Sequence, residues 1–340
     1  MVVYRRWYLT PCHFTPPPHM IKCNEHIKKG TGYMKLVILD VDTGIDDSLA
    51  LAYAAHSPEL DILGVTTVFG NITVEEATRN TLVVLDKLER EEIPVYAGES
   101  KPMSREYTKP FARHIHGEDG IGNQYREPSE RQAQHMSAAD FIVQQIQASP
   151  GKVTVVAVGP LTNIAKAIQT DPTIVNTIER LVVMGGAVTV PGNVTPYAEA
   201  NIYSDPDAAA FVLTSGMPIT LVGLDVTMKT LLTGVHLDEW RRENSALSVF
   251  LADMTEFYMG AYNEIVTGGK GCALHDPLAV GVAIDPTIVR TTSYAIHVEC
   301  TDPDALGKTT GKHDTAVAHI DVALDVDSSR FLKHFLSRIV

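Results

Sequence analysis

From Lys35 onward, the chain repeats one unit: a short apolar run, a turn rich in Gly or Asp, and a segment with apolar residues at helical spacing. Apolar runs this short are typical of strands that are buried on both faces of a sheet. Strands that alternate with helices in this way predict a parallel sheet with right-handed crossover connections. The predicted strands are 36–39, 60–68, 93–97, 153–158, 181–184 and 219–224.

The predicted helices are 45–55, 74–88, 138–148, 161–168, 206–213 and a longer helical region at 235–265. The fold class is therefore α/β, with a single doubly wound, mostly parallel β-sheet core flanked by helices. Ligands of such open sheets bind beyond the carboxyl ends of the strands. Polar or glycine residues stand at those ends in this chain: Asp42, Asn71, Gly159, Gly185 and Asp225.

Residues 1–33 differ from the rest of the chain. They contain three consecutive prolines at 16–18 and show no periodicity. They also lack the apolar stretch of about 7–15 residues that a signal peptide needs. We expect a disordered N-terminal extension, or a start assigned upstream of Met34. Residues 34–340 are expected to form a single domain, because no linker or internal repeat divides them.

The composition narrows the classes of partner. With 45% hydrophobic and 20% charged residues, the chain is not disordered throughout. The net charge of −13 argues against a nucleic-acid polymer or an anionic membrane as partner. No run approaches the roughly 20 apolar residues that span a bilayer. The four cysteines form no C-x-x-C pair, so we expect no zinc ribbon, no disulfide framework and a cytoplasmic location.

The densest chemical signal is the segment 40–47, Asp-Val-Asp-Thr-Gly-Ile-Asp-Asp, which holds four carboxylates at a predicted strand-to-helix junction. Carboxylates this close repel one another. A hard divalent cation, Ca²⁺ or Mg²⁺, would offset that repulsion through oxygen ligands. The absence of Cys and His from the segment disfavours zinc. Capping of the following helix by Asp46 and Asp47 is the simpler alternative.

The segment 40–47 resembles the N-terminal signature of the nucleoside hydrolases, the inosine–uridine-preferring ribonucleoside N-ribohydrolases. A single motif of this kind carries little weight, but further motifs resemble those of the family in the same order along residues 34–340. They are Gly70-Asn71, Gly159–Ile164, Met184–Gly186 with Gly192-Asn193, Glu199–Asn201 and His275–Pro277. The chain departs from the family in its long extension and in Thr43, which stands where Pro is common.

The resemblance implies one bound Ca²⁺ and hydrolysis of the N-glycosidic bond of ribonucleosides to ribose and a free purine or pyrimidine base, in nucleoside salvage. The implied Ca²⁺ ligands are Asp42, Asp47, Asp276 and the carbonyl of Val158. Asp42 is also the implied general base, and His275 the implied group that protonates the leaving base. The residues implied to hold the ribose are Asp46, Asn71, Met184, Asn193, Glu199, Asn201 and Asp276.

The polar stretch at 100–135 breaks the alternation of strands and helices, and long irregular stretches inside a domain are often functional. Within it, the segment His116–Gly122 resembles a family loop near the base pocket. Tyr258 and Tyr262 stand at i and i+4 of a predicted helix that folds over the base in the family. Core packing of the two tyrosines is the alternative.

The residue types suit the implied reaction. Breaking the bond leaves an oxocarbenium-like sugar, which carboxylates stabilise. Ribose offers only hydroxyl groups, which Asn and Asp recognise by hydrogen bonds. Several residues also have structural explanations: Asn71 and Asn193 as turn residues, Asp276 as a helix N-cap, and Glu199 and Asn201 as neighbours on one strand face.

Two other functions stay open at this point. The Asp-x-Asp pattern also resembles the Mg²⁺-dependent aspartate-nucleophile phosphatases, although no downstream lysine and acidic pair follow in order. A non-catalytic nucleoside- or ribose-binding protein on the same fold is the other alternative. The sequence does not decide between purine and pyrimidine bases. The resemblance further implies a homodimer or homotetramer.

Overall fold

The computed structural model describes residues 34–265, 271–313 and 320–340, so the predicted extension at 1–33 lies outside the described residues. Its strands are β1 (Lys35–Val41), β2 (Leu60–Thr67), β3 (Val95–Ala97), β4 (Val153–Ala157), β5 (Arg180–Met184), β6 (Ile219–Val222), β7 (Leu231–Leu232), β8 (Cys272–Ala273), β9 (Val289–Val298), β10 (Thr309–Lys312) and β11 (Ile320–Val326).

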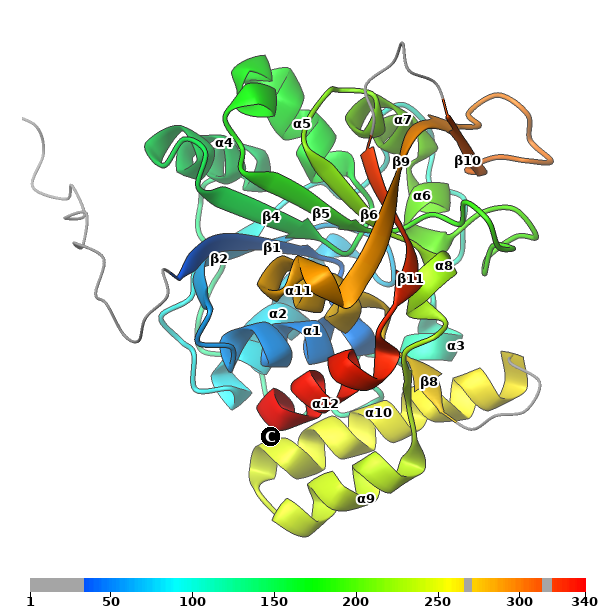
Figure 1. The fold of residues 1–340 in the computed structure, drawn as a ribbon. Coiled ribbons are helices and arrows are strands. Elements are labelled where there is room, and N and C mark those ends of the chain that lie inside the picture. The colour runs from blue at the N-terminus through cyan, green and yellow to red at the C-terminus, as the bar shows by residue number, and fades with distance from the viewer. Residues whose placement is uncertain (1–33, 266–270, 314–319) are drawn as a thin grey trace, which may run out of the picture. The chain divides into compact units, whose positions relative to one another are not determined.

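In the described residues, nine of these strands form one sheet in the order β10–β9–β11–β6–β5–β4–β1–β2–β3 (Figure 1). The strands from β3 to β11 in this order all run parallel, whereas β9 pairs antiparallel with both β11 and β10. Strands β7 and β8 form a separate antiparallel pair. The predicted doubly wound, mostly parallel sheet is confirmed.

The helices are α1 (Ile45–Ala55), α2 (Val74–Lys87), α3 (Arg113–His116), α4 (Ala138–Ala148), α5 (Thr162–Thr170), α6 (Ala200–Ser204), α7 (Pro206–Leu213), α8 (Leu224–Thr227), α9 (Gly234–Glu243), α10 (Ala246–Ile265), α11 (His275–Ile284) and α12 (Ser328–Ile339). Two short 3₁₀ helices span Pro172–Asn176 and Pro286–Ile288. Among the described residues, no helix combines the length and the apolar composition that crossing a bilayer requires.

Two hydrophobic cores lie on opposite faces of the sheet, because successive strand residues point to opposite faces. In β1, Val37 and Leu39 belong to one core and Ile38 to the other. The first core takes in residues of α1, α2, α10, α11 and α12, and the second takes in residues of α4, α5 and α7 (Figure 1). This burial on both faces explains why the strands read as continuous apolar runs.

The order of the strands reverses at β1, which lies between β2 and β4. From β1 the chain adds β2 and β3 on one side, and from β4 it adds β5 and β6 on the other side. Such a reversal opens a crevice at the carboxyl ends of the two central strands. Asp42 and Val158, the residues that follow β1 and β4, are therefore placed near each other at this edge of the sheet.

Helices α1 and α4 begin and end where the sequence predicts, whereas other features differ, among them the predicted helical region 235–265, which forms the two helices α9 and α10. Leu224 begins α8 and does not extend β6. The segment around Glu199 and Asn201 is helical and not extended. Strands β9 to β11 had no predicted counterpart; in β9, only three of the ten residues are buried and there is no continuous apolar run.

Aromatic contacts hold helix α12 against α1, and we expect them to contribute to the stability of the fold. The ring of Phe331 is fully buried and lies 6.3 Å from the ring of Tyr53 and 6.0 Å from that of Phe335. Phe331→Ala is expected to lower the free energy of unfolding by about 3–5 kcal/mol, as measured by urea denaturation. Phe211→Ala, at a position that is 38% exposed, is expected to change it by about 0.5 kcal/mol or less. Equal losses in both variants would contradict this packing.

Candidate functional site

Three carboxylates stand in the acidic turn, residues 42–47, which joins β1 to α1. Asp42, Asp46 and Asp47 are all buried. The backbone N–H groups of Asp42 and Gly44 donate to Asp47 at 3.0 and 2.9 Å. Asp47 therefore caps the helix to which it belongs, as the simpler interpretation of the segment expected. Capping does not account for Asp42 and Asp46, which make no such bond to the helix.

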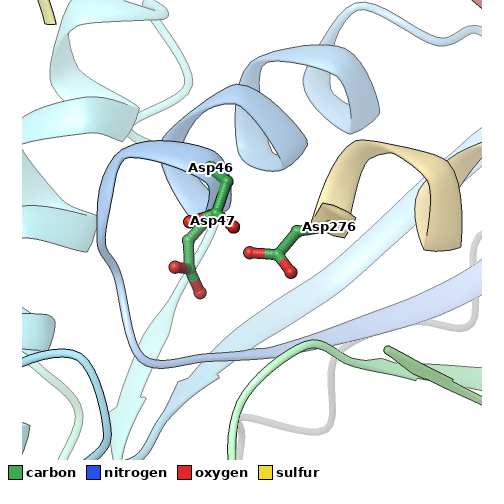
Figure 2. Close-up of side chains that lie close together, drawn as sticks. All are labelled: Asp46, Asp47 and Asp276. Carbon is green, nitrogen blue, oxygen red and sulfur yellow. The ribbon is translucent and has the colours of Figure 1, made fainter. Parts of the chain in front are cut away.

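Asp276 brings a fourth carboxylate to the acidic turn from the start of α11. Carboxylate oxygens of Asp46, Asp47 and Asp276 lie within 4.8 Å of one another (Figure 2). The expectation that Asp276 is a helix N-cap is wrong, because the helix begins at His275 and the N-cap residue is Leu274. Asp276 instead lies within the first turn, and its side chain points toward the acidic turn (Figure 2).

Three oxygens of these carboxylates are buried without a hydrogen-bond partner among the described residues: Asp42 Oδ1, Asp46 Oδ1 and Asp276 Oδ2. A buried, unpartnered carboxylate oxygen is costly unless a cation or a donor meets it. Carboxylate oxygens are the preferred ligands of hard divalent cations. The residues therefore fit a metal ion bound at this position.

In the absence of a cation, the charges of neighbouring carboxyl groups in the cluster change one another's pKa values. Burial, and then the charge of Asp47, raise the pKa of Asp46 to about 7. The same two causes raise the pKa of Asp42 well above its usual range. Burial, followed by the charge of Asp46, does the same to the pKa of Asp276. The metal-free cluster therefore retains protons near neutral pH.

Asn71 fixes the orientation of two of these carboxylates. Its backbone N–H donates to Asp42 Oδ2 at 2.6 Å, and its side-chain amide donates to Asp47 Oδ2 at 3.2 Å. A Cβ on the preceding Gly70 would lie 2.1 Å from Asp42 Oδ2, so only glycine allows this close approach. Asn71 is thus more than a turn residue.

The carbonyl of Val158 follows β4 and is held by the side chain of Asn201. The Asn201 amide donates to this carbonyl at 2.7 Å and to the carbonyl of Met184 at 3.1 Å. Glu199 is the N-cap of α6, and its carboxylate accepts from the backbone N–H groups of Gly186, Asn201 and Ile202. The two residues thus meet the pocket from a helix start, not from one face of a strand.

A pocket of about 360 Å³ opens above the cluster. It brings together twelve of the residues implied by the resemblance: Asp46, Asn71, His116, Val158, Met184, Asn193, Glu199, Asn201, Tyr258, Tyr262, His275 and Asp276. Asp42 and Asp47 are not among the residues that line it, and both are buried. Asn193 is exposed at its rim, and its side-chain oxygen accepts from the backbone N–H of Ala200 at 3.0 Å.

Part of the pocket wall is aromatic and neutral. His275 contacts the hydroxyl of Tyr262 through Nε2 and that of Thr227 through Nδ1, the latter at 2.8 Å. Burial lowers the pKa of His275 to about 4. The Tyr258 hydroxyl donates to Asp46 Oδ2 at 3.4 Å, and its ring lies 5.0 Å from that of Tyr262. The tyrosines therefore face the pocket and do more than pack in the core.

His116 closes another side of the pocket and stacks on Tyr258 at 5.6 Å between ring centroids. The backbone N–H of Ile45 donates to His116 Nδ1 at 3.0 Å, so Nδ1 is an acceptor and the proton resides on Nε2. Burial and the charge of Lys109 lower the pKa of His116 to about 3, so it forms no ion pair with Asp46. A Cβ on Gly44 would lie 2.5 Å from Nδ1, which explains the glycine there.

One pocket residue, Lys109, was not predicted from the sequence, and one acid of segment 40–47, Asp40, lies outside the pocket. Lys109 lines the pocket and donates to the hydroxyl of Ser204 at 3.2 Å, and it gave no signal beyond its place in the irregular stretch. Asp40, the first acid of segment 40–47, does not line the pocket. It contacts Thr66 and accepts from the side chain of Asn163 at 2.7 Å.

Comparison with known proteins gives consistent matches. Residues 37–333 match the family model for inosine-uridine preferring nucleoside hydrolase. Uridine nucleosidase 1 of Arabidopsis thaliana is 38% identical over 82% of this chain and 83% of that protein. Pyrimidine-specific ribonucleoside hydrolase RihB of Escherichia coli is 38% identical over 80% of this chain and 86% of that protein. The solved structure of a purine-preferring ribonucleoside hydrolase from Gardnerella vaginalis is 42% identical, with a TM-score of 0.87 over 90% of this chain and 98% of that chain.

The cluster predicts cation binding that depends on Asp276. Asp276→Asn removes one charge from the three grouped carboxylates and is expected to weaken the binding of Ca²⁺, used as a probe, at least roughly tenfold. Calorimetric titration of the chelator-treated protein measures this. Asp238→Asn, at an exposed position on α9, is the matched control and should leave the affinity unchanged. Equal affinities in the two variants would place the cation elsewhere.

The raised pKa of Asp46 predicts how stability varies with pH. A carboxyl whose pKa rises on folding stabilises the native state fully below its unfolded pKa of about 4, and this contribution is lost as the pH rises through the folded pKa. That folded pKa is about 7. The thermal midpoint of the chelator-treated protein is expected to fall between about pH 6 and pH 8, and added Ca²⁺ should raise it more at pH 8. A Ca²⁺-induced shift that is the same at both pH values would contradict this.

Proposed function

Because the chain belongs to the inosine-uridine preferring nucleoside hydrolase family and is a ribonucleoside hydrolase, we propose that it cleaves inosine- and uridine-type ribonucleosides in a Ca²⁺-dependent reaction. The products are ribose and a free purine or pyrimidine base. The observation that carries the proposal is a single pocket in which buried carboxylates adjoin neutral aromatic and imidazole groups. The carboxylates suit a cationic sugar, and the neutral groups suit an uncharged base.

The carboxylates account for the sugar half of the reaction. Breaking the C1′–N bond leaves positive charge on the ribose, which fixed anions stabilise more in the transition state than in the ground state. Asp46 and Asp276 line the pocket and supply this charge. Asn71, Asn193 and Asn201, together with Glu199, offer hydrogen bonds to the ribose hydroxyls, and Met184 packs against the sugar. A site built this way rejects a deoxyribonucleoside, because its buried polar groups would go unpaired.

Asp42 is proposed as the general base that takes a proton from the attacking water. Asn71 holds Asp42 Oδ2 by its backbone N–H, which leaves the buried Oδ1 without a partner in the described part of the chain. An oriented carboxylate with one free oxygen is what proton removal requires. Asp42, Asp47, Asp276 and the Val158 carbonyl would hold Ca²⁺. When bound, the ion lowers the pKa of water and offsets the mutual repulsion of the carboxylates.

Tyr262 and His275 are proposed to supply the proton that the departing base needs. Burial lowers the pKa of His275 to about 4 and raises that of the Tyr262 hydroxyl above its usual range. Both groups are therefore uncharged near neutral pH and linked by a hydrogen bond. The donor passes its O–H or N–H proton to the base and is reprotonated from solvent, while Asp42 releases to solvent the proton that it takes from the attacking water, so the protons balance.

The assay measures release of free base and reducing sugar from inosine, uridine, cytidine and adenosine, before and after chelation. Asp42→Asn is expected to lower kcat by about 10²–10⁴-fold, the usual contribution of a general base. Asp238→Asn serves again as the exposed control and should behave as wild type. Circular dichroism establishes that both variants fold. A folded, Ca²⁺-loaded wild type that cleaves no nucleoside would overturn the proposal, and a phosphatase or a binding protein would then be tested.

The same assay measures which base the enzyme prefers, because it compares four nucleosides. Among the similar proteins, two are named for uridine or pyrimidines and one for purines, so substrates of both classes belong in it. We further propose that the protein is a homodimer or homotetramer in the cytoplasm. Size-exclusion chromatography with light scattering measures the molar mass and so tests the oligomeric state.

A further inference from the structure

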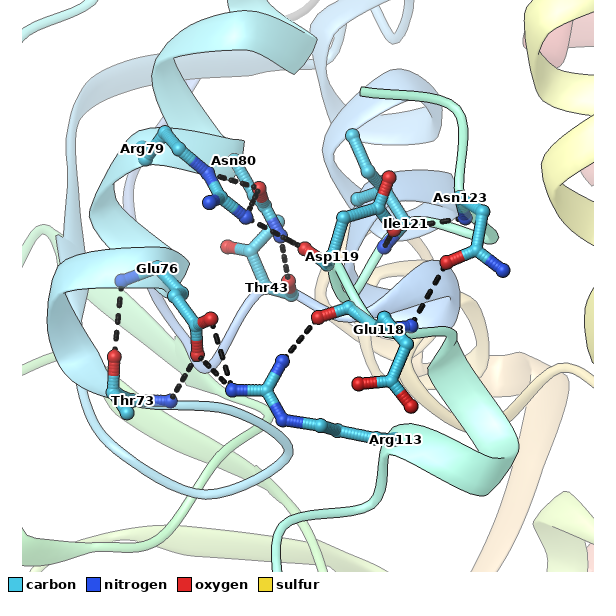
Figure 3. A network of polar contacts seen from close by, with 10 residues as sticks. All are labelled: Thr43, Thr73, Glu76, Arg79, Asn80, Arg113, Glu118, Asp119, Ile121 and Asn123. Carbon is cyan, nitrogen blue, oxygen red and sulfur yellow. Dashed lines mark hydrogen bonds and ion pairs between the residues drawn. The ribbon is translucent and has the colours of Figure 1, made fainter. Parts of the chain in front are cut away.

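The loop at 112–125, which carries His116 into the pocket, is held from outside the pocket by helix α2 (Figure 3). The first contact between this loop and α2 is the ion pair of Arg113 with Glu76. Arg113 Nη2 lies 2.9 Å from each carboxylate oxygen of Glu76, and both side chains are less than one-third exposed. Glu76 also accepts from the backbone N–H of Thr73 at 3.2 Å and so completes the capping box of α2.

The second contact lies one helical turn further along α2. The side chains of Arg79 and Asn80 both donate to the carbonyl of Asp119, at 2.7 and 2.9 Å. The Arg79 guanidinium also lies 4.5 Å from the centre of the Tyr125 ring. The Asp119 carboxylate in turn accepts from the backbone N–H groups of Ile121 and Asn123 (Figure 3). It also accepts from the backbone N–H of Tyr125 and so fixes the turn of the loop.

Helix α2 holds the acidic turn as well. Asn80 is fully buried, and its amide donates to the carbonyl of Thr43 at 3.3 Å while it donates to Asp119. The hydroxyls of Thr43 and Thr81 lie 2.6 Å apart. Residues of one helix turn therefore connect the loop of His116 to the segment that carries Asp42, Asp46 and Asp47. The Ile45 N–H bond to His116 closes this connection on the pocket side.

We propose that Glu76, Arg79 and Asn80 are positioning residues for His116, acting through the loop and without contact to the pocket. The proposal rests on the proposed function, because it assigns to His116 the recognition of the nucleoside base. With the loop held by α2, the neutral imidazole keeps Nδ1 on the Ile45 N–H and presents Nε2–H to the base. Loosening the Glu76 contact should weaken nucleoside binding and leave the carboxylates that carry out the reaction in place. Loosening the Asn80 contacts should weaken binding and also disturb the acidic turn, because the same amide holds Thr43.

Glu76→Gln tests the first contact with little risk to folding, because Gln also completes a capping box. It removes the ion pair with Arg113 and is expected to raise KM for uridine and inosine about three- to tenfold, with kcat within about twofold. Glu75→Gln, at the exposed neighbouring position, is the matched control and should leave both constants unchanged. Asn80→Asp, which loses the amide bonds to Asp119 and to Thr43, tests the second contact and should raise KM further while also lowering kcat, because Thr43 belongs to the acidic turn.

Two further readouts separate positioning from a general structural effect. Amide hydrogen exchange should become faster in Glu76→Gln at residues 117–125 and stay unchanged in α5. In the double variant Glu76→Gln/His116→Ala, the rise in KM should not exceed that of His116→Ala alone, because the effect passes through His116. Additive effects on KM, or wild-type KM in both α2 variants, would overturn the proposal.

Hydrogen exchange also separates failure of this inference from failure of the proposed function. If the wild type cleaves no nucleoside, the proposed function fails, and the role of α2 is decided by exchange and by the imidazole ¹⁵N signals of His116. Those signals should shift in Glu76→Gln and not in Glu75→Gln. Unchanged exchange and unchanged signals would show that α2 does not position this loop.

Discussion

Repulsion among buried carboxylates is the constraint on which the rest of the site depends. Asp42, Asp46 and Asp47 precede or begin α1, Asp276 lies in the first turn of α11, and the two helices pack together. The positive ends of the two helix dipoles offset part of the repulsion, by about 0.3–1 kcal/mol per charge. Backbone N–H groups satisfy Asp47, yet one oxygen on each of the other three carboxylates stays buried and without a partner in the described residues. A bound cation would offset this repulsion and meet these oxygens.

The same constraint explains the division of the pocket. Among the groups that adjoin the carboxylates, Asn71 donates hydrogen bonds, whereas the tyrosines and the two histidines stay uncharged. The anionic part suits a sugar that becomes positively charged, and the neutral part suits a base that must gain a proton. Both parts are assembled at one reversal of strand order, where β1 and β4 end together.

Much of this could be predicted from the sequence, for physical reasons that differ between regions. The strand before segment 40–47 was predictable because a strand buried on both faces is a continuous apolar run. The chemical importance of the segment was predictable because carboxylates so close together repel one another. Helix α6 was not, since five residues are too few for a helical pattern and Glu199 is an uncommon N-cap. Asp276 was misplaced because Leu274 occupies the cap without a side-chain bond. Lys109 was missed because it lies in an irregular stretch, where only the folded loop brings it to the pocket.

In the proposed site, a cation takes the place of protons in the carboxylate cluster. Calorimetric titration of the chelator-treated protein with Ca²⁺ near pH 7, in two buffers of different ionisation enthalpy, measures the number of protons released per ion bound. Because the pKa of Asp46 is raised to about 7 and those of Asp42 and Asp276 are raised as well, the account predicts saturable binding with release of roughly one proton or more. Binding heats that do not depend on the buffer, or the absence of saturable binding, would contradict it.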